Sequence, residues 1–418
     1  MVDLLPEPVA AIARKTVGRS LLTLAAVQGA VIAGLVLLDV AKKRRRTKRK
    51  GFPRPGTFDS TVSDTRVTTY TYGDDLYRDM IQAIDEAKDR IFIETFIWKD
   101  DDTGRRFKDA LNEAAGRGVE VSIMYDGFAN LVVPSSFFRF HQDIRVYRFP
   151  VVRPSMLFQT LRGTGLDHRK LLVVDDHIGF VGGYNIGSLY ATEWRDTHLR
   201  LVGPSVWDLR QAFVNVWNDH AAGSPAEIPH TTPAVWEPRI RAVNNIPADL
   251  VYPIRGIYLD AINRARDHIF VTMAYFIPDQ QILKALLAAS SRGVDVRLIL
   301  PEDSNHILSD WLSRGFYRSL LEAGVTVLLY RNAMIHAKTA TIDGSWSTVG
   351  SANIDRLSLT GNYEINLEIH DVNFASDMQK IFAVDSGNCR VLTLEEWRDR
   401  HSLARFSEAV LVPLRPLL

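Results

Sequence analysis

The amino-acid sequence of this chain repeats itself, and no other feature limits its possible fold as strongly. The segment Asp89–Ile93 (DRIFI) recurs as Asp267–Val271 (DHIFV). Both are short apolar runs, which is the pattern of a buried strand. A helical pattern follows each run and stops at a glycine, Gly118 or Gly293, after which a second apolar strand begins. The sequence therefore predicts two copies of one α/β unit.

The repeat divides the 418 residues into two lobes of ordinary domain size. A third strand is expected over 144–149 in the first copy and over 325–330 in the second. Prolines, glycine, serine and threonine gather between the copies, as in an extended linker. We expect a first lobe at 56–224, a linker at 225–236 and a second lobe at 237–418, each with a mostly buried sheet covered by helices.

The composition excludes several classes of protein. With 46% hydrophobic and 24% charged residues, the chain is globular, and its net charge of +1 gives no broadly basic surface for nucleic acid. A single cysteine, Cys389, excludes an intramolecular disulfide. No pattern of cysteines and histidines predicts a metal site, so we expect neither a metal nor another cofactor.

The amino terminus differs from the rest of the chain. No charged residue occurs from Leu21 to Leu38, and every residue from Lys42 to Lys50 except Thr47 is basic. The apolar stretch is at the short end of the ~20 residues that span a bilayer. We expect a single uncleaved membrane anchor with the catalytic body on the cytoplasmic side, because the basic run follows the apolar stretch. A cleaved signal peptide and a buried or interfacial helix are the alternatives.

Two copies of the pattern His-x-Lys-x4-Asp carry the chemistry. They comprise His168, Lys170, Asp175, His336, Lys338 and Asp343. The interval from His168 to His336 also separates Gly182 from Gly350, Asn185 from Asn353, and Asp196 from Glu364. Chance matches would not keep this register, so the motifs belong to the repeat.

Local structure explains the spacing within each motif. Alternate side chains of an extended segment share a face, so His168 and Lys170 point the same way. Asp175 and Asp343 are expected at turns, where they serve either in the catalytic set or purely in the turn. Asn185 comes close to a predicted helix start, where an anion can be bound.

Two such motifs facing each other supply what phosphoryl transfer needs. One imidazole attacks phosphorus and forms a phosphohistidine, while the other protonates the leaving alcohol and then deprotonates the acceptor. The two lysines hold the phosphoryl oxygens, together with Asn185, Asn353 and Ser351. Asp196 and Glu364 are expected to orient the histidine rings. A lysine beside each histidine argues against a metal.

At these residues the sequence resembles the phospholipase D superfamily, and in particular its bacterial cardiolipin synthase branch. The segments that carry the branch resemblance are 95–101 (TFIWKDD), 182–186 (GGYNI), 194–198 (WRDTH), 275–279 (YFIPD), 350–355 (GSANID) and 412–418 (VPLRPLL). The resemblance covers residues 65–418. It implies two lobes packed about a pseudo-twofold axis, with His168 as nucleophile and His336 as general acid/base.

Three functions remain open from the sequence. The resemblance favours transfer of a phosphatidyl group, with two phosphatidylglycerols giving cardiolipin and glycerol. A phospholipase D that uses water as acceptor shares the same intermediate, and pocket walls decide between them. A nuclease of the same superfamily is disfavoured, because the only basic run adjoins the apolar stretch, where it would attract anionic lipid. The expected partners are therefore phosphatidylglycerol and a membrane, and not nucleic acid.

Overall fold

A computed structural model describes residues 22–38, 41, 51–151, 165–220, 227–233, 235 and 237–413. Leu21, the basic segment Lys42–Lys50 and part of the expected linker lie outside these described residues.

The first lobe is built on a sheet of eight strands in the order β1-β2-β9-β7-β6-β3-β4-β5. The strands are β1 (Thr57–Val62), β2 (Thr65–Tyr70), β3 (Arg90–Thr95), β4 (Glu120–Asp126), β5 (Arg145–Phe149), β6 (Leu171–Val174), β7 (Ile178–Gly182) and β9 (His198–Val202). Strands β3, β4 and β5 are parallel, and the other pairs are antiparallel.

The second lobe repeats this arrangement in the order β10-β17-β16-β15-β11-β12-β13-β18. Its strands are β10 (Ile240–Asn245), β11 (His268–Met273), β12 (Asp295–Pro301), β13 (Thr326–Tyr330), β15 (Lys338–Ile342), β16 (Trp346–Gly350), β17 (Glu364–His370) and β18 (Cys389–Leu392). Six consecutive strands from β9 to β5 thus correspond to the six from β17 to β13. The two α/β lobes predicted from the repeat are confirmed.

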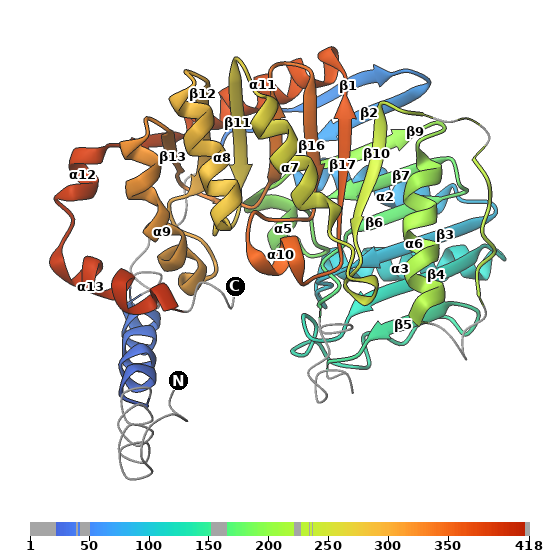
Figure 1. Ribbon diagram of the computed structural model, residues 1–418. Coiled ribbons are helices and arrows are strands. Elements are labelled where there is room, and N and C mark those ends of the chain that lie inside the picture. Colours follow the sequence, from blue (N-terminus) through green and yellow to red (C-terminus); the bar gives the residue numbers. More distant parts are fainter. Residues whose placement is uncertain are drawn as a thin grey trace, which may run out of the picture.

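Helices cover the sheets of both lobes (Figure 1). In the first lobe they are α2 (Gly73–Asp85), α3 (Asp102–Gly116), the short α5 (Ser188–Thr192) and α6 (Val206–His220). In the second they are η2 (Pro247–Asp249), α7 (Pro253–Arg264), α8 (Gln280–Ser291), α9 (Ile307–Glu322), α10 (Arg356–Thr360), α11 (Val372–Gly387), α12 (Leu394–Arg398) and α13 (Ser402–Leu411). The antiparallel strands β7 and β16 lead through tight loops to α5 and α10, which lie near the junction of the lobes.

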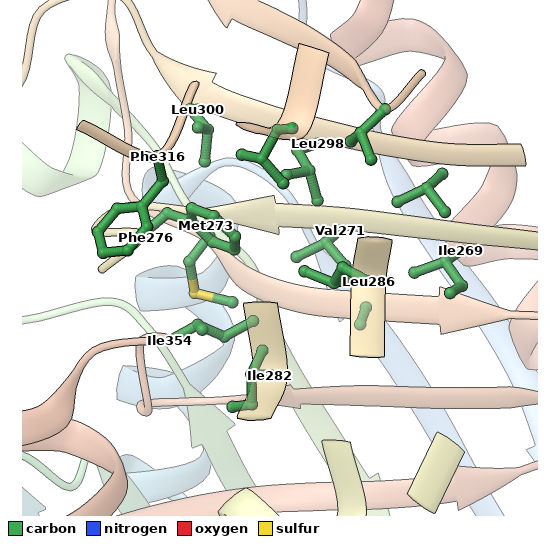
Figure 2. Close-up of a cluster of buried hydrophobic side chains, with 14 of the residues drawn as sticks. Ile269, Val271, Met273, Phe276, Ile282, Leu286, Leu298, Leu300, Phe316 and Ile354 are labelled. Carbon is green, nitrogen blue, oxygen red and sulfur yellow. The ribbon is translucent and has the colours of Figure 1, made fainter. Parts of the chain in front are cut away.

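Each lobe has its own apolar core beneath the helices that precede and follow its parallel strands. Figure 2 shows this core in the second lobe, where Ile282 and Leu286 of α8 face Val271 and Met273 of β11. The buried, apolar face of α8 and the continuous apolar run of β11 are what the sequence pattern predicts.

A third core joins the lobes to each other. It combines residues of the first lobe, such as Phe92 and Phe213, with residues of the second, such as Leu367 and Phe374. Phe92 and Phe213 stack with ring centroids 4.9 Å apart, and all four side chains are almost inaccessible to solvent. Burying a side chain of this size contributes ~1.5–3 kcal/mol to folding, so the two lobes stabilise each other as one body.

Residues 22–38 form a helix that extends away from the two sheets below α13 (Figure 1). The side chain of Gln28 donates to the carbonyl oxygen of Val410, and Leu35 packs into the core of the second lobe. Within the described parts of the chain, no helix combines the length and apolar character required to cross a bilayer. The spanning anchor expected over Leu21–Leu38 is therefore not supported.

Candidate active site

The two motifs begin at the amino-terminal ends of corresponding central strands. His168 and Lys170 precede β6, and His336 and Lys338 stand at the start of β15. All four side chains are buried, with at most 8% of any residue's surface exposed. Because the motif alternates through extended backbone, each lysine lies on the same side of its segment as its histidine.

Backbone pairing between the lobes brings the two motifs together. The short strands β8 (Trp194–Arg195) and β14 (Met334–Ile335) pair in parallel, and the N–H of His336 donates to the carbonyl of Arg195 at 2.7 Å. On the other side of the pseudo-twofold axis, the N–H of His168 donates to the carbonyl of Tyr363 at 3.0 Å. Each histidine is therefore fixed to the opposite lobe by its own main chain.

Each histidine ring is held by a carboxylate from the opposite lobe. Nδ1 of His168 lies 3.0 Å from both oxygens of Glu364, and Nδ1 of His336 lies 2.6 Å from Oδ2 of Asp196. The sequence predicted that these carboxylates orient the rings, but not that the pairs cross between the lobes. With Nδ1 bound to a carboxylate, Nε2 is the nitrogen of each ring that can react.

Burial makes both imidazoles weak bases. It lowers the pKa of His168 to about 4 and the pKa of His336 to about 3, and the neighbouring lysines act in the same direction. Burial alone would raise the pKa of Asp196 and Glu364, but each stays below its ordinary value because the neighbouring histidine and lysine favour the anion. At neutral pH the free enzyme therefore has two neutral imidazoles and two carboxylates.

The two lysines form the cationic part of the site. Lys170 donates to the carbonyl of His168, and Lys338 donates to the carbonyl of His336. Burial lowers the pKa of Lys170 to about 7 and that of Lys338 to about 8, and the charge of Lys338 lowers the pKa of Lys170 further. A phosphodiester anion between them would offset this repulsion and favour the charged form of both lysines.

Asn185 and Asn353 lie in the two loops that follow β7 and β16. The side-chain oxygen of Asn185 accepts the N–H of Ile97 at 3.2 Å, and that of Asn353 accepts the N–H of Tyr275 at 3.4 Å. These bonds fix both carboxamides, and the amide nitrogen is the end of each that can donate to a phosphoryl oxygen.

Ser351 contacts the carboxylate that holds His168. Its hydroxyl donates to Glu364 and accepts the N–H of Ile365 at 3.0 Å. The corresponding residue in the first lobe is Gly183, where a side chain would collide with the carboxylate of Asp196. The geometry therefore favours a role for Ser351 in holding Glu364, and through it His168, over the direct substrate contact predicted from the sequence.

Asp175 and Asp343 lie at the opposite ends of β6 and β15 from the histidines. Lys170 and Asp175 are five residues apart in extended chain, which is roughly 16 Å. The carboxylate of Asp175 accepts the N–H groups of Lys88, Asp89 and Arg90 at 2.8–3.0 Å.

Asp343 makes the same three bonds in the second lobe, to the N–H groups of residues 266–268. Both aspartates have positive φ, 51° and 50°. This geometry favours the turn role, which the sequence left open, over a place in the catalytic set.

Two side-chain contacts near the site could not be predicted from the sequence. Arg195 binds Asp385 of α11 through two hydrogen bonds of 3.1 and 2.8 Å, and it also donates to the carbonyl of Asp196. In the corresponding position of the second lobe, the hydroxyl of Tyr363 lies 3.1 Å from Nε2 of His220 at the end of α6. In the sequence, Arg195 and Tyr363 stand out only because they directly precede Asp196 and Glu364, the carboxylates expected to orient the histidines.

No group of three or more histidine, cysteine, aspartate or glutamate side chains that could hold a metal ion occurs among the described residues. The expectation that the enzyme works without a metal stays a prediction.

Comparison with known proteins agrees with this geometry. The family model described as "Cardiolipin synthase, PLD-like domain" matches residues 80–217 and 258–385, which contain both motifs. The chain is 32% identical to the major cardiolipin synthase ClsA of Bacillus subtilis over 372 residues, covering 85% of this chain and 76% of that protein. It is also 32% identical to a cardiolipin synthase of Staphylococcus aureus over 368 residues, covering 85% and 74% of the two chains.

Solved structures share the fold at low sequence identity. A phosphatidylserine synthase of Haemophilus influenzae matches 86% of this chain and 93% of its own, with a TM-score of 0.63 and 14% identity. A polyphosphate kinase of Porphyromonas gingivalis matches 84% and 52%, with a TM-score of 0.52 and 16% identity. The duplicated motifs, the crossed pairs and the sequence relatives lead to one conclusion: the chain belongs to the cardiolipin synthase branch of the phospholipase D superfamily and is an enzyme of that type.

Proposed function

We propose that the protein is a phosphatidyl transferase that joins two phosphatidylglycerols into cardiolipin through a phosphohistidine intermediate. The observation that carries the proposal is the pair of crossed histidine–carboxylate contacts, 3.0 Å at His168 and 2.6 Å at His336. They leave two reactive Nε2 atoms beside two lysines in a single buried site. This set of groups supplies a nucleophile, an acid/base and positive charge for the phosphoryl oxygens.

In the first half-reaction Nε2 of His168 attacks phosphorus, and the bond from phosphorus to the glycerol oxygen breaks. A proton on Nε2 of His336 goes to that oxygen. In the free enzyme His336 is neutral, so it must gain this proton as the substrate binds. Burial and the lysine charges together lower the pKa of His336, and the negative charge of the phosphodiester favours protonation because it opposes the lysine charges.

In the second half-reaction a hydroxyl of another phosphatidylglycerol gives its proton to Nε2 of His336. Its oxygen attacks phosphorus, the bond from phosphorus to His168 breaks, and cardiolipin is released. The assignment of His168 as nucleophile rests on the resemblance to the family, because both pairs present Nε2 in the same way. His336 then holds the proton of the acceptor hydroxyl and releases it to solvent as cardiolipin leaves, which offsets the proton taken up on substrate binding. Both histidines are then neutral again, and the cycle is balanced.

Product analysis tests the proposal. The full-length protein is incubated with phosphatidylglycerol vesicles, and the lipids and released glycerol are measured by mass spectrometry. We expect one glycerol for each cardiolipin. Phosphatidic acid as the sole lipid product would establish a hydrolytic phospholipase D instead, and cleavage of DNA with no lipid product would establish a nuclease.

We also propose that the enzyme works at the cytoplasmic surface of a membrane. Apolar side chains at both ends of helix 22–38 are exposed, among them Leu22 and Leu37, and so is Phe406 of α13, against which this helix lies. The basic segment Lys42–Lys50 follows in the sequence and would be attracted to anionic lipid. Protease added outside intact cells should leave residues beyond 56 uncut, and their degradation would place the catalytic body outside.

A further inference from the structure

The second lobe contains a cavity of about 760 Å³ close to the active site. Its walls come from the amino-terminal ends of α7 and α8, from α9 and from α10. Ile277, Phe316 and Leu359 give it apolar surface, while Arg255 and Arg356 give it two guanidinium groups. Asp279 and Asp355 add two carboxyl groups, and Asp279 forms an ion pair with Arg255. Apolar surface beside guanidinium and carboxyl groups suits an amphiphile with an anionic headgroup that carries hydroxyls.

Asp355 connects the cavity to the catalytic groups. It belongs to the cavity wall and follows Asn353 of the active-site loop by two residues. Burial raises the pKa of Asp355 to about 7, and both Glu364 and Lys338 lie near enough to shift it. Tyr275 forms a second connection, since its ring lies 6.3 Å from that of His336 and it precedes Ile277 of the wall by two residues.

The corresponding place in the first lobe has no carboxylate. Gly187 holds the position of Asp355, and a side chain there would come within 3.0 Å of Cγ of Lys99. The next residue, Ser188, donates its N–H to Asp101 at 2.7 Å, which closes the loop against the start of α3. The two lobes share strand order, motifs and crossed pairs, but they differ at this point.

We infer that the cavity binds the acceptor phospholipid of the transfer reaction, an anionic phosphodiester with a polyol headgroup. This inference rests on the proposed function. The acceptor hydroxyl has to reach His336, which the second lobe supplies, and the leaving glycerol occupies only a small part of 760 Å³. The remaining volume takes the phosphodiester, beside Arg356 and Arg255, and the first part of the acyl chains.

The contacts of the wall assign a role to each polar group. Arg255 is oriented by Asp279 and Gln281, so its guanidinium is fixed in the cavity wall with its charge paired to Asp279. Oδ1 of Asp355 accepts the N–H of Ser358 at 2.7 Å, which fixes the carboxyl group at the start of α10. From there Asp355 binds a hydroxyl of the headgroup and directs the acceptor oxygen towards Nε2 of His336.

The substitution Thr360→Trp tests this inference. Thr360 is an exposed residue of α10 that lines the cavity, and a tryptophan there would take up part of its volume. Leu357→Trp is the matched control, because Leu357 is 41% exposed on the same helix and is not part of the wall. Two reactions of the full-length enzyme are compared: cardiolipin formation, and exchange of isotope-labelled glycerol into phosphatidylglycerol.

Exchange needs only the intermediate and a small alcohol, whereas cardiolipin needs a bound acceptor lipid. Thr360→Trp should lower cardiolipin formation at least tenfold and leave exchange within about twofold, while Leu357→Trp changes neither. Arg356→Gln should raise the phosphatidylglycerol concentration at half-maximal cardiolipin formation and spare exchange. The inference would be overturned if Thr360→Trp left cardiolipin formation unchanged. It would also be overturned if Thr360→Trp and Arg356→Gln each lowered cardiolipin formation and glycerol exchange equally. Absence of cardiolipin from the unaltered enzyme would overturn the proposed function instead.

Discussion

At the scale of single residues, the two histidine–carboxylate pairs are similar but not equivalent. Glu364 receives the hydroxyl of Ser351, whereas Asp196 receives the backbone N–H of Thr197 at 2.8 Å. Gly183 leaves no room for a side chain beside Asp196. The proposed reaction needs such a difference, because one imidazole must bind phosphorus while the other carries a proton.

The crossing of the pairs predicts how carboxylate variants should behave. A donor with p-nitrophenol as leaving group needs no general acid, because its phenolate leaves without a proton. With this donor, His336→Ala and Asp196→Asn should still release a burst of p-nitrophenol. His168→Ala and Glu364→Gln should lose it, by about two orders of magnitude or more, because they affect the nucleophile. Rapid-mixing absorbance measurements of the four variants provide the check.

If His336→Ala and Asp196→Asn lost the burst while His168→Ala and Glu364→Gln kept it, His336 would be the nucleophile and His168 the general acid. If Asp196→Asn abolished the burst together with His168→Ala, the carboxylates would act within their own lobes and the crossed geometry would be wrong.

The shifted pKa values predict the pH profile of kcat/KM, which reports on the free enzyme. His168 is a nucleophile only when neutral, so activity should hold below pH 6 and fall as the pH drops through about 4. Lys170 and Lys338 stabilise the phosphoryl oxygens only when charged, so activity should fall as the pH rises through their pKa values of about 7 and about 8. The test is a rate profile on the donor with p-nitrophenol as leaving group, which needs no proton from His336, and an acid limb near the ordinary histidine pKa of about 6.5 would contradict it.

At the scale of elements, the strands and turns of each repeat follow from local sequence. The apolar runs before Gly118 and Gly293 predicted β3 and β11, and the glycines predicted the helix ends before β4 and β12. Asp175 stabilises such an element: it joins the turn after β6 to the start of β3 through three backbone hydrogen bonds.

Asp175→Asn should therefore lower the free energy of unfolding and have little effect on kcat. Asparagine tolerates the positive φ of this turn but offers one acceptor oxygen and no charge. We expect a loss of about 1–2 kcal/mol in the free energy of unfolding, with kcat of the folded enzyme within about threefold. Denaturant unfolding and activity assays on the same sample measure both. Asp343→Asn is the matched variant and should give a similar loss of stability. A large fall in kcat for Asp175→Asn without a loss of stability would show instead that Asp175 takes part in catalysis.

Other elements could not be predicted, because they form only when the lobes meet. Strands β8 and β14 have two residues each and no periodicity, and their pairing depends on the partner lobe. The contacts of Arg195 with Asp385 and of Tyr363 with His220 join positions far apart in the sequence. The repeat predicted that Asp196 and Glu364 orient the rings, because they are separated by the same interval as the two histidines. That interval does not show whether each carboxylate contacts the histidine of its own lobe or of the opposite lobe.

At the scale of the whole molecule, catalysis requires both lobes. The shared core around Phe92 and Leu367 joins the sheets, and each histidine takes its carboxylate from the opposite side. The two lobes differ at Asp355 and Gly187, and Asp355 lines a cavity of the second lobe next to the catalytic groups. A duplicated fold thus combines a symmetric catalytic centre with one-sided substrate binding.

Separated lobes should therefore be inactive and regain activity when combined. Fragments 51–224 and 237–418 each lack the carboxylate for their own histidine and expose one side of the shared core. Co-expressed, they should purify together and release p-nitrophenol from the activated donor, because the core and the crossed pairs reform. The state of each fragment has to be measured by light scattering, since two copies of the first lobe can pair His168 with Asp196 across a twofold axis. A monomeric first lobe that forms the phosphohistidine by itself would show that the crossed carboxylate is dispensable.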